Sequence, residues 1–214
     1  MLIIDNKIVI AHMKKCGGTS VCKGLIETLP AERIQYLGYT AEGEQRSAKS
    51  RRKGGLWKHS TASEIVSSLK RDRGDLTVYL VSLRPWQQRV ASFYHHARRY
   101  NAEMGKYKWV KGMSFSKFLR SPHVEEVERL DQFCKGDSVD FFVRYSDLSR
   151  WYEGLLAQLN CPMRPLPTYN VGSTAKSSSY LDMFSAEDLQ LMSERFAAED
   201  RLLATVAAQG QMVA

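Results

Sequence analysis

Apolar residues along this chain form short runs typical of buried strands and longer segments with helical spacing. The short runs predict strands at Lys7 to Ala11, Arg33 to Tyr39, Leu76 to Leu83 and Val139 to Tyr145. The helical spacing predicts helices at Val21 to Leu29, Ala62 to Lys70, Trp86 to Tyr100, Leu148 to Leu159 and Ala186 to Ala204. Because strands that alternate with helices usually pair in parallel, the pattern predicts an α/β fold with a central, mostly parallel sheet flanked by helices.

Two polar stretches interrupt this alternation. Residues 40–56 are basic and contain glycine, which predicts a mobile loop. Residues 101–122 are basic, aromatic and irregular, which predicts a segment that covers a binding site. Two helix starts are better defined, because Thr61 with Glu64 fits a capping box and Ser185 fits an N-cap. The residues after Ala204 are expected to fray.

Composition limits the class of protein. A chain of 214 residues, with 43% hydrophobic and 25% charged residues, suits one globular domain over residues 1–214. No apolar run approaches the roughly 18 residues of a membrane-spanning helix, and no export signal is visible. The four cysteines lack metal-ligand spacing, so reduced thiols in the cytoplasm are expected; they are Cys16, Cys22, Cys134 and Cys161.

The stretch from Lys7 to Leu29 is the most informative, because a strand, a glycine loop and a helix follow one another. Adjacent glycines let a ligand approach the backbone, and the helix start offers unpaired N–H groups and a positive dipole end. The loop lacks the Walker spacing of nucleotide triphosphatases, Gly-x-x-x-x-Gly-Lys-Ser/Thr, and it lacks the Cys-x5-Arg spacing of cysteine phosphatases. A glycine turn that only reverses the chain is the alternative, although a lysine before the glycines favours an anion site. The loop reads His12-Met13-Lys14-Lys15-Cys16-Gly17-Gly18-Thr19-Ser20.

This loop resembles the 5′-phosphosulfate loop of sulfotransferases that use 3′-phosphoadenosine 5′-phosphosulfate (PAPS), above all their carbohydrate and bacterial branch, where it reads His-x-Pro-Lys-Thr-Gly-Gly-Thr-Ser. A second block resembles the family's 3′-phosphate motif, a strand ending in arginine with a serine eight residues on; Arg84 and Ser92 have this spacing. Weaker similarities lie at Val139 to Leu148 and Leu166 to Asn170. The resemblance covers most of the chain, but only the two phosphate motifs are specific.

The resemblance implies a P-loop nucleotide-kinase-like three-layer fold, PAPS as donor, adenosine 3′,5′-bisphosphate as product and no metal. It implies a hydroxyl acceptor, most plausibly on a carbohydrate or glycoconjugate. The expected donor-binding residues are Lys14, Lys15, Cys16, Gly17, Gly18, Thr19, Ser20, Arg84 and Ser92. Lys14 stands where the family has proline, Cys16 replaces a hydroxyl residue, and Pro85 follows Arg84 where the family usually has Arg-Asp-Pro.

Sulfuryl transfer needs a stabilised leaving phosphate and a base for the acceptor's proton. We assign the first role to Lys15, helped by backbone N–H groups of the loop. We assign the second to His59, which precedes a capped helix and, as an imidazole, titrates near neutral pH. A non-catalytic His59 is the alternative, with His95 and His96 as fallback bases, while His12 is expected to brace the loop.

Other residues and functions stay open in the sequence. Arg89 either assists the 3′-phosphate site or is solvated, and Asn170 is a weaker carry-over from the family. The net charge of +8 favours acidic ligands. Nucleic acid is not expected among them, because the sequence shows neither a nucleic-acid-binding motif nor aromatic residues interleaved with the basic ones. The alternatives are an ATP- and Mg²⁺-dependent kinase and a non-enzymatic polyanion-binding module. The apolar side of the last predicted helix, Ala186 to Ala204, either packs within the domain or forms an oligomer surface.

Overall fold

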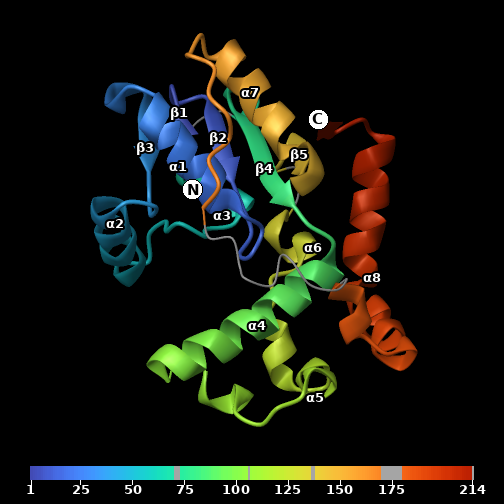
Figure 1. Cartoon of the computed structure of the whole chain (residues 1–214). Coiled ribbons are helices and arrows are strands. Elements are labelled where there is room, and N and C mark those ends of the chain that lie inside the picture. The colour runs from blue at the N-terminus through green and yellow to red at the C-terminus, as the bar shows by residue number, and fades with distance from the viewer. Residues whose placement is uncertain (70–72, 106, 136–137, 170–179, 214) are drawn as a thin grey trace.

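A sheet of six strands forms the centre of the computed structural model, which describes residues 1–69, 73–105, 107–135, 138–169 and 180–213 (Figure 1). Its order is β3-β1-β2-β4-β5-β6. Strands β2, β4, β5 and β6 are parallel, whereas β1 runs antiparallel to β2 and β3. The strands are β1 (Leu2–Ile4), β2 (Ile8–Ala11), β3 (Ile34–Tyr36), β4 (Thr77–Leu83), β5 (Phe141–Arg144) and β6 (Met212–Val213). A mostly parallel α/β sheet is thus confirmed.

The edges of the sheet differ from the prediction. Strand β1 escaped the pattern because it is only three residues long and joins β2 through a tight turn, in which Asp5 and Asn6 have positive φ. The predicted strand at Arg33 to Tyr39 is shorter and antiparallel. The expectation of a frayed tail is wrong, because Phe142 donates to the carbonyl of Gln211 at 2.8 Å and β6 pairs with β5.

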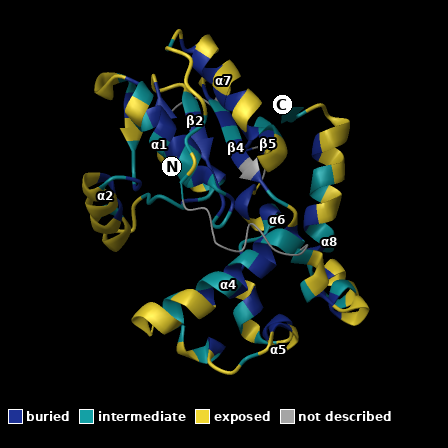
Figure 2. Cartoon of the chain, in the orientation of Figure 1, coloured by how far each residue is buried: buried dark blue, intermediate teal, exposed yellow. Residues whose placement is uncertain are grey.

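Helices cover both faces of the sheet (Figures 1 and 2). On one face α1 (Gly18–Thr28) and α7 (Leu148–Gln158) pack on side chains such as Leu2 and Ile10. On the other face α3 (Ala62–Ser68), α6 (Leu130–Phe133) and the end of α8 (Ala186–Ala208) pack on Ile3 and Val9. Alternate residues of β1 and β2 therefore serve opposite cores, as the period of two in a strand requires.

A third cluster lies beyond the carboxyl ends of the parallel strands, below the sheet in Figure 1. It joins α4 (Trp86–Met104), α5 (Phe115–Leu119) and the beginning of α8. Most of segment 101–122 belongs here: its aromatic residues pack on α4, and the hydroxyl of Tyr94 donates to the carbonyl of Met113 at 2.6 Å. Whether this segment covers an acceptor stays a prediction.

The prediction of a mobile loop over residues 40–56 is corrected, because most of this stretch is helix α2 (Ala41–Arg52). The side chain of Thr40 caps the helix by accepting from the N–H of Gly43 at 3.0 Å. Acidic residues occupy its first turn and basic residues its last, the arrangement that the helix dipole favours. The helix is polar and largely exposed, so it lacks the apolar periodicity on which the prediction relied (Figure 2).

The predicted helix starts at Thr61 and Ser185 are confirmed, each as a reciprocal capping box. Within the described ranges, every helix is too short or too polar to cross a membrane. Short 3-10 helices connect the larger elements, among them η1 (Ala31–Arg33), η2 (Arg73–Asp75), η3 (Lys108–Val110), η4 (Pro122–Glu126), η5 (Tyr145–Asp147) and η7 (Tyr180–Met183).

Candidate functional site

The glycine loop connects the carboxyl end of β2 to the amino end of α1. Gly17 is the N-cap of α1, with φ of 80°, and Lys15 also has a positive φ, 64°. No side chain caps this helix; Ser20 donates its N–H to the carbonyl of Gly17 at 3.1 Å. The first amides of an α-helix otherwise lack intrahelical acceptors, so the loop presents donors and a positive dipole end to one place.

Gly18 is required by the close approach of His12. A Cβ atom at position 18 would lie 2.3 Å from the His12 ring. The imidazole of His12 is buried, and its Nδ1 lies 3.1 Å from the hydroxyl of Tyr39. Burial lowers the pKa of His12 well below its ordinary value. The expectation of a packed His12 is therefore confirmed, and its ring packs against the loop at Gly18.

Arg84, at the end of β4, reaches the same loop. Its Nη2 lies 3.5 Å from the position that a Cβ atom on Gly17 would take. Tyr145 of η5 stacks on it, with the guanidinium carbon 3.8 Å from the ring centroid. The Nε of Arg84 is buried and has no hydrogen-bond partner among the described residues. The structure thus brings Arg84 and Gly17 together, as the two motifs predict for one shared ligand.

Tyr145 belongs to the candidate site by its contacts, and the sequence reasoning missed it. Its Cε2 lies 3.1 Å from the same Cβ position on Gly17, and 47% of the residue is exposed. The available signal was its place directly after β5, because side chains that follow neighbouring parallel strands meet at one edge of the sheet.

Arg89 is not solvated, which corrects one of the two interpretations of it; a part in the 3′-phosphate site stays a prediction. Its side chain is 1% exposed and pairs with Glu199, which is 0% exposed, at 2.5 Å. Ser92, on the same helix α4, is half-buried, and no hydrogen bond within the described residues joins it to the loop. Its place in the 3′-phosphate site stays a prediction.

The side chains of Lys14 and Cys16 point to neighbours within the protein. Glu128 accepts from the N–H of Lys14 at 2.7 Å and pairs with its ammonium at 2.8 Å. The thiol of Cys16 is buried in the core, and burial raises its pKa to about 11. A ligand in the loop can thus contact Cys16 only through its backbone.

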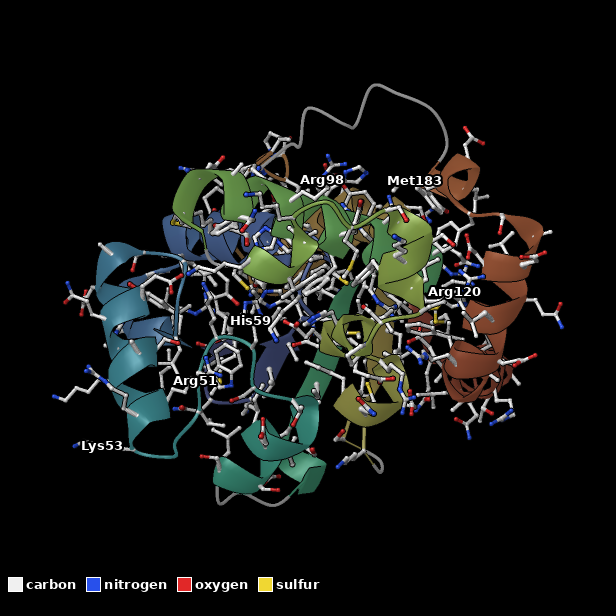
Figure 3. The ribbon with its side chains drawn as sticks, turned by 90° about the horizontal axis from the view of Figure 1, so that it is seen from below. Arg51, Lys53, His59, Arg98, Arg120 and Met183 are labelled. Atoms are coloured by element: carbon white, nitrogen blue, oxygen red, sulfur yellow. The ribbon has the colours of Figure 1, made fainter. Side chains whose placement is uncertain are left out.

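His59 lies in a pocket beside the loop, on the side of α2. The pocket has a volume of about 250 Å³ and is lined by Thr19, Lys23, Tyr39, Glu44, Lys58 and His59. Two of these lining residues form an ion pair, the ammonium of Lys58 with Glu44 at 2.7 Å. In the view from below, His59 lies inside the protein near Arg51, whereas Lys53 extends away from it (Figure 3). The predicted base and the loop residue Thr19 therefore share one pocket.

Burial and positive charge keep the imidazole of His59 neutral. Burial is the main cause that lowers its pKa to about 3, and Lys58, Lys14, the α-amino group of Met1 and Lys15 act in the same direction. The His59 ring lies 5.1 Å from that of His12 and 5.2 Å from that of Trp57. Its buried Nδ1 has no hydrogen-bond partner in the described part of the chain. An anion bound nearby would raise the pKa of His59, because it offsets these positive charges.

The predicted late segment meets the loop at Ser20. The hydroxyl of Ser20 accepts from the N–H of Tyr169 at 3.1 Å, and the hydroxyl of Tyr169 donates to Glu27 at 2.7 Å. Lys23 lies 4.5 Å from the ring centroid of Tyr169. Asn170, the weaker carry-over, lies outside the described residues.

The fallback bases lie on α4. His96 packs on Tyr100 at 4.1 Å between ring centroids, and His95 lies against Tyr94 at 5.9 Å. Neither lines the pocket that holds His59. A second, more apolar hollow between α7 and the sheet contains none of the predicted site residues.

The remaining predictions concern thiols and metals. All four cysteines are free, and Cys16, Cys22 and Cys134 are buried. Among the described residues, no group of three or more His, Cys, Asp or Glu side chains could hold a metal ion.

Comparisons of the chain with protein-family models, with curated proteins and with solved structures give no significant match. The case for a function therefore depends on the residues and their geometry.

Proposed function

We propose that this protein is a PAPS-dependent sulfotransferase that acts on a hydroxyl group, most plausibly of a carbohydrate or glycoconjugate. The observation that supports this proposal is the approach of Arg84 to Gly17, at the carboxyl ends of parallel strands. Such an edge is where ligands bind in open α/β sheets. A nucleotide that carries phosphates at both its 3′ and 5′ positions matches a helix start and an arginine that face one another.

In this proposal the loop holds the 5′-phosphate, and Arg84 with Ser92 holds the 3′-phosphate. The N–H groups at the start of α1 and the ammonium of Lys15 offset charge that grows on the leaving phosphate. The unpartnered Nε of Arg84 supports a ligand-binding role, because a buried donor without an acceptor is costly. The donor supplies the sulfuryl group, so the protein's part is positioning and electrostatics.

His59 is the proposed base. The acceptor oxygen forms a bond to sulfur, the bond from sulfur to the phosphate oxygen breaks, and the hydroxyl proton passes to the imidazole. The pocket shared with Thr19 supports this role, since it places the imidazole beside the loop. With a pKa of about 3 the ligand-free imidazole is a weak base, and the negative charges of the donor would raise that pKa towards a useful range.

A cytoplasmic location belongs to the same proposal. Its support is the set of free thiols, which suit a reducing compartment. A nucleotide-kinase-like arrangement of the fold belongs to it as well, and the mostly parallel sheet with helices on both faces supports it.

Thermal-shift titration with adenosine 3′,5′-bisphosphate, AMP and ATP, each with and without Mg²⁺, tests the proposal. A ligand that binds the native state raises the melting temperature by mass action. We expect the bisphosphate to stabilise the protein far more than AMP does, without Mg²⁺. Equal effects of bisphosphate and AMP would contradict the site, selective stabilisation by ATP with Mg²⁺ would favour a kinase, and indifference to all three with steep salt-dependent binding of heparin would favour a polyanion-binding module.

A transfer assay then tests the reaction itself. Release of adenosine 3′,5′-bisphosphate from PAPS should depend on a hydroxyl acceptor, and a panel of neutral and acidic carbohydrates would identify its class. Binding of the bisphosphate without acceptor-dependent release from any member of the panel would direct the search to other hydroxyl compounds.

A further inference from the structure

Arg89 of α4 and Glu199 of α8 form a buried ion pair close to the proposed donor site. The contact is bidentate: Nη2 donates to Oε2 at 2.5 Å and Nη1 donates to Oε1 at 2.9 Å. Both side chains are shielded from solvent. Such a pair fixes direction as well as distance, because the planar guanidinium matches both oxygens of the carboxylate.

The same two side chains hold the backbone of two further segments. Nη1 of Arg89 also donates to the carbonyl of Arg84 at 2.8 Å, and its Nη2 lies 3.4 Å from the carbonyl of Glu128. Oε2 of Glu199 accepts from the N–H of Leu130 at 2.8 Å. The pair thus ties the end of β4 and the segment 128–130 to helix α8.

Each of these segments carries a group of the proposed donor site. The carbonyl of Arg84 belongs to the residue whose guanidinium lies beside Gly17. Glu128 holds the start of the glycine loop, since its carboxylate accepts from the N–H of Lys14 and pairs with the Lys14 ammonium. One buried contact therefore connects the backbones behind both predicted phosphate sites.

We propose that Arg89 and Glu199 are positioning residues, which set the separation between Arg84 and the glycine loop and so make the site selective for a nucleotide phosphorylated at both its 3′ and 5′ positions. This inference rests on the proposed function. Neither residue touches the donor in this proposal. Arg89 acts through the carbonyls of Arg84 and Glu128, and Glu199 acts through Arg89 and the N–H of Leu130. A buried ion pair is a weak source of net stability, whereas a shift of about 1 Å in a binding group can cost about 10²-fold in rate.

Arg89→Lys and Glu199→Gln test the proposal, with Glu125→Gln as the matched control. The lysine keeps a positive charge opposite Glu199 but cannot hold the carboxylate, the Arg84 carbonyl and the Glu128 carbonyl together. The glutamine keeps the shape of Glu199 and removes its charge. The control removes an ion pair between η4 and α8, from half-buried Arg195 to exposed Glu125 at 3.3 Å, and leaves the Arg89 to Glu199 pair intact.

Binding of adenosine 3′,5′-bisphosphate and of AMP is measured by calorimetry at a temperature at which circular dichroism shows each variant folded. We expect Kd for the bisphosphate to rise about tenfold in both test variants, because a displaced binding group loses contacts. The ratio of Kd for AMP to Kd for the bisphosphate should therefore fall. In the transfer assay KM for PAPS should rise by a similar factor while kcat at saturating PAPS changes less. Glu125→Gln should bind like the wild type.

Each outcome decides the proposal. Folded variants that keep wild-type affinity and selectivity overturn it, even if they melt at a lower temperature, because a purely structural role predicts that result. An equal loss in Glu125→Gln also overturns it, since general docking of α8 would then be the cause. If Glu199→Gln does not fold, Arg89→Lys decides alone. If the wild-type protein shows no preference for the bisphosphate over AMP, both the proposed function and this inference are overturned. If the wild-type protein is selective and the variants bind as it does, only this inference is overturned.

Discussion

The two flanks of the glycine loop are built differently. On the flank towards α8, the Arg89 to Glu199 pair is buried and each partner also binds backbone groups. On the flank towards α2, His59 has a buried ring nitrogen without a partner among the described residues and lines a pocket. The first flank suits the holding of charges at fixed positions, and the second suits a group that must exchange a proton.

The difference follows from the cost of burying polar groups. A buried charge is tolerated when it is paired and hydrogen-bonded, and such a network becomes rigid. A buried imidazole can avoid that cost by staying neutral, and the low pKa of His59 reflects this. A bound anion therefore changes the two flanks to different extents: we expect the paired flank to stay in place and the His59 flank to change its protonation.

Among the predictions that test this difference between the flanks, loss of Lys15 should have the largest effect on kcat. Lys15→Ala should lower kcat by about 10²–10³-fold, because the leaving phosphate loses a stabilising charge. Lys14→Ala should lower kcat less, since Glu128 already pairs with the Lys14 ammonium. Single-turnover kinetics with PAPS, together with bisphosphate binding, measure both. Near-normal turnover of Lys15→Ala with intact binding would show that the charge of Lys15 is not used.

Gly18→Ala should disturb the point where the flanks meet. The added Cβ would lie 2.3 Å from the His12 ring, so His12 must shift, and we expect a loss of about 1–3 kcal/mol in the free energy of unfolding. Gly154→Ala is the control: no atom lies within 4 Å of its Cβ position, and alanine in the interior of α7 should add about 0.5–1 kcal/mol. Urea denaturation measures both, and an unchanged Gly18→Ala would rule out tight packing there.

Titration separates the flanks directly. The pKa of His59 in the folded protein, about 3, lies below its ordinary value of 6.5, so the unfolded chain binds more protons between these values. The His59 contribution to the free energy of unfolding is therefore fully present above pH 6.5 and is lost as pH falls towards 3, with a slope of at most about 1.4 kcal/mol per pH unit. Buried His12 adds dependence of the same sign.

Denaturation of wild type and His59→Gln across this pH window provides the measurement. The variant should show a flatter dependence, with the remainder from His12. Addition of adenosine 3′,5′-bisphosphate should raise the pKa of His59, which NMR of its ring protons reports. A pKa that does not respond to a saturating concentration of the bisphosphate would place the anion away from this flank.

The smallest effect is expected from the cap of α2, the helix that borders the His59 flank through Glu44. Thr40→Ala removes the N-cap and should cost about 1 kcal/mol of helix stability, with little change in activity. Hydrogen exchange of the α2 amides is the readout, and Thr61→Ala, which removes the cap of α3, is the matched variant. If these amides exchange in the wild type as fast as those of an unfolded chain, the segment is the mobile loop that its composition first indicated.

Local signals in the sequence predicted local structure well. The glycine loop correctly announced a following helix, although α1 begins at Gly18 and not at the predicted Val21, and the Thr61 and Glu64 pattern marked the start of α3. Thr40, with acids in the following turn and bases in the last, was an equally legible helix signal for α2, missed because an exposed helix needs no apolar periodicity. Strands of two or three residues, such as β6, carry too few positions for their pattern to be recognised.

Contacts between distant segments were beyond the sequence. Arg89 looked like a solvated or ligand-binding residue because Glu199, its partner, lies 110 positions away on another helix. Tyr145 and Glu128 became site residues only when the sheet brought η5 and the segment before α6 to the loop.

The order of residues alone determined the α/β class, the glycine loop that leads into a helix and the strand end that carries Arg84. These features depend on neighbours within a few positions, through caps, glycine conformations and alternating burial. Tertiary structure decided that Arg84 lies beside Gly17, that Lys14 and Arg89 are already paired, and that His59 is buried among cations. Such properties depend on burial and distance between segments, and folding creates both.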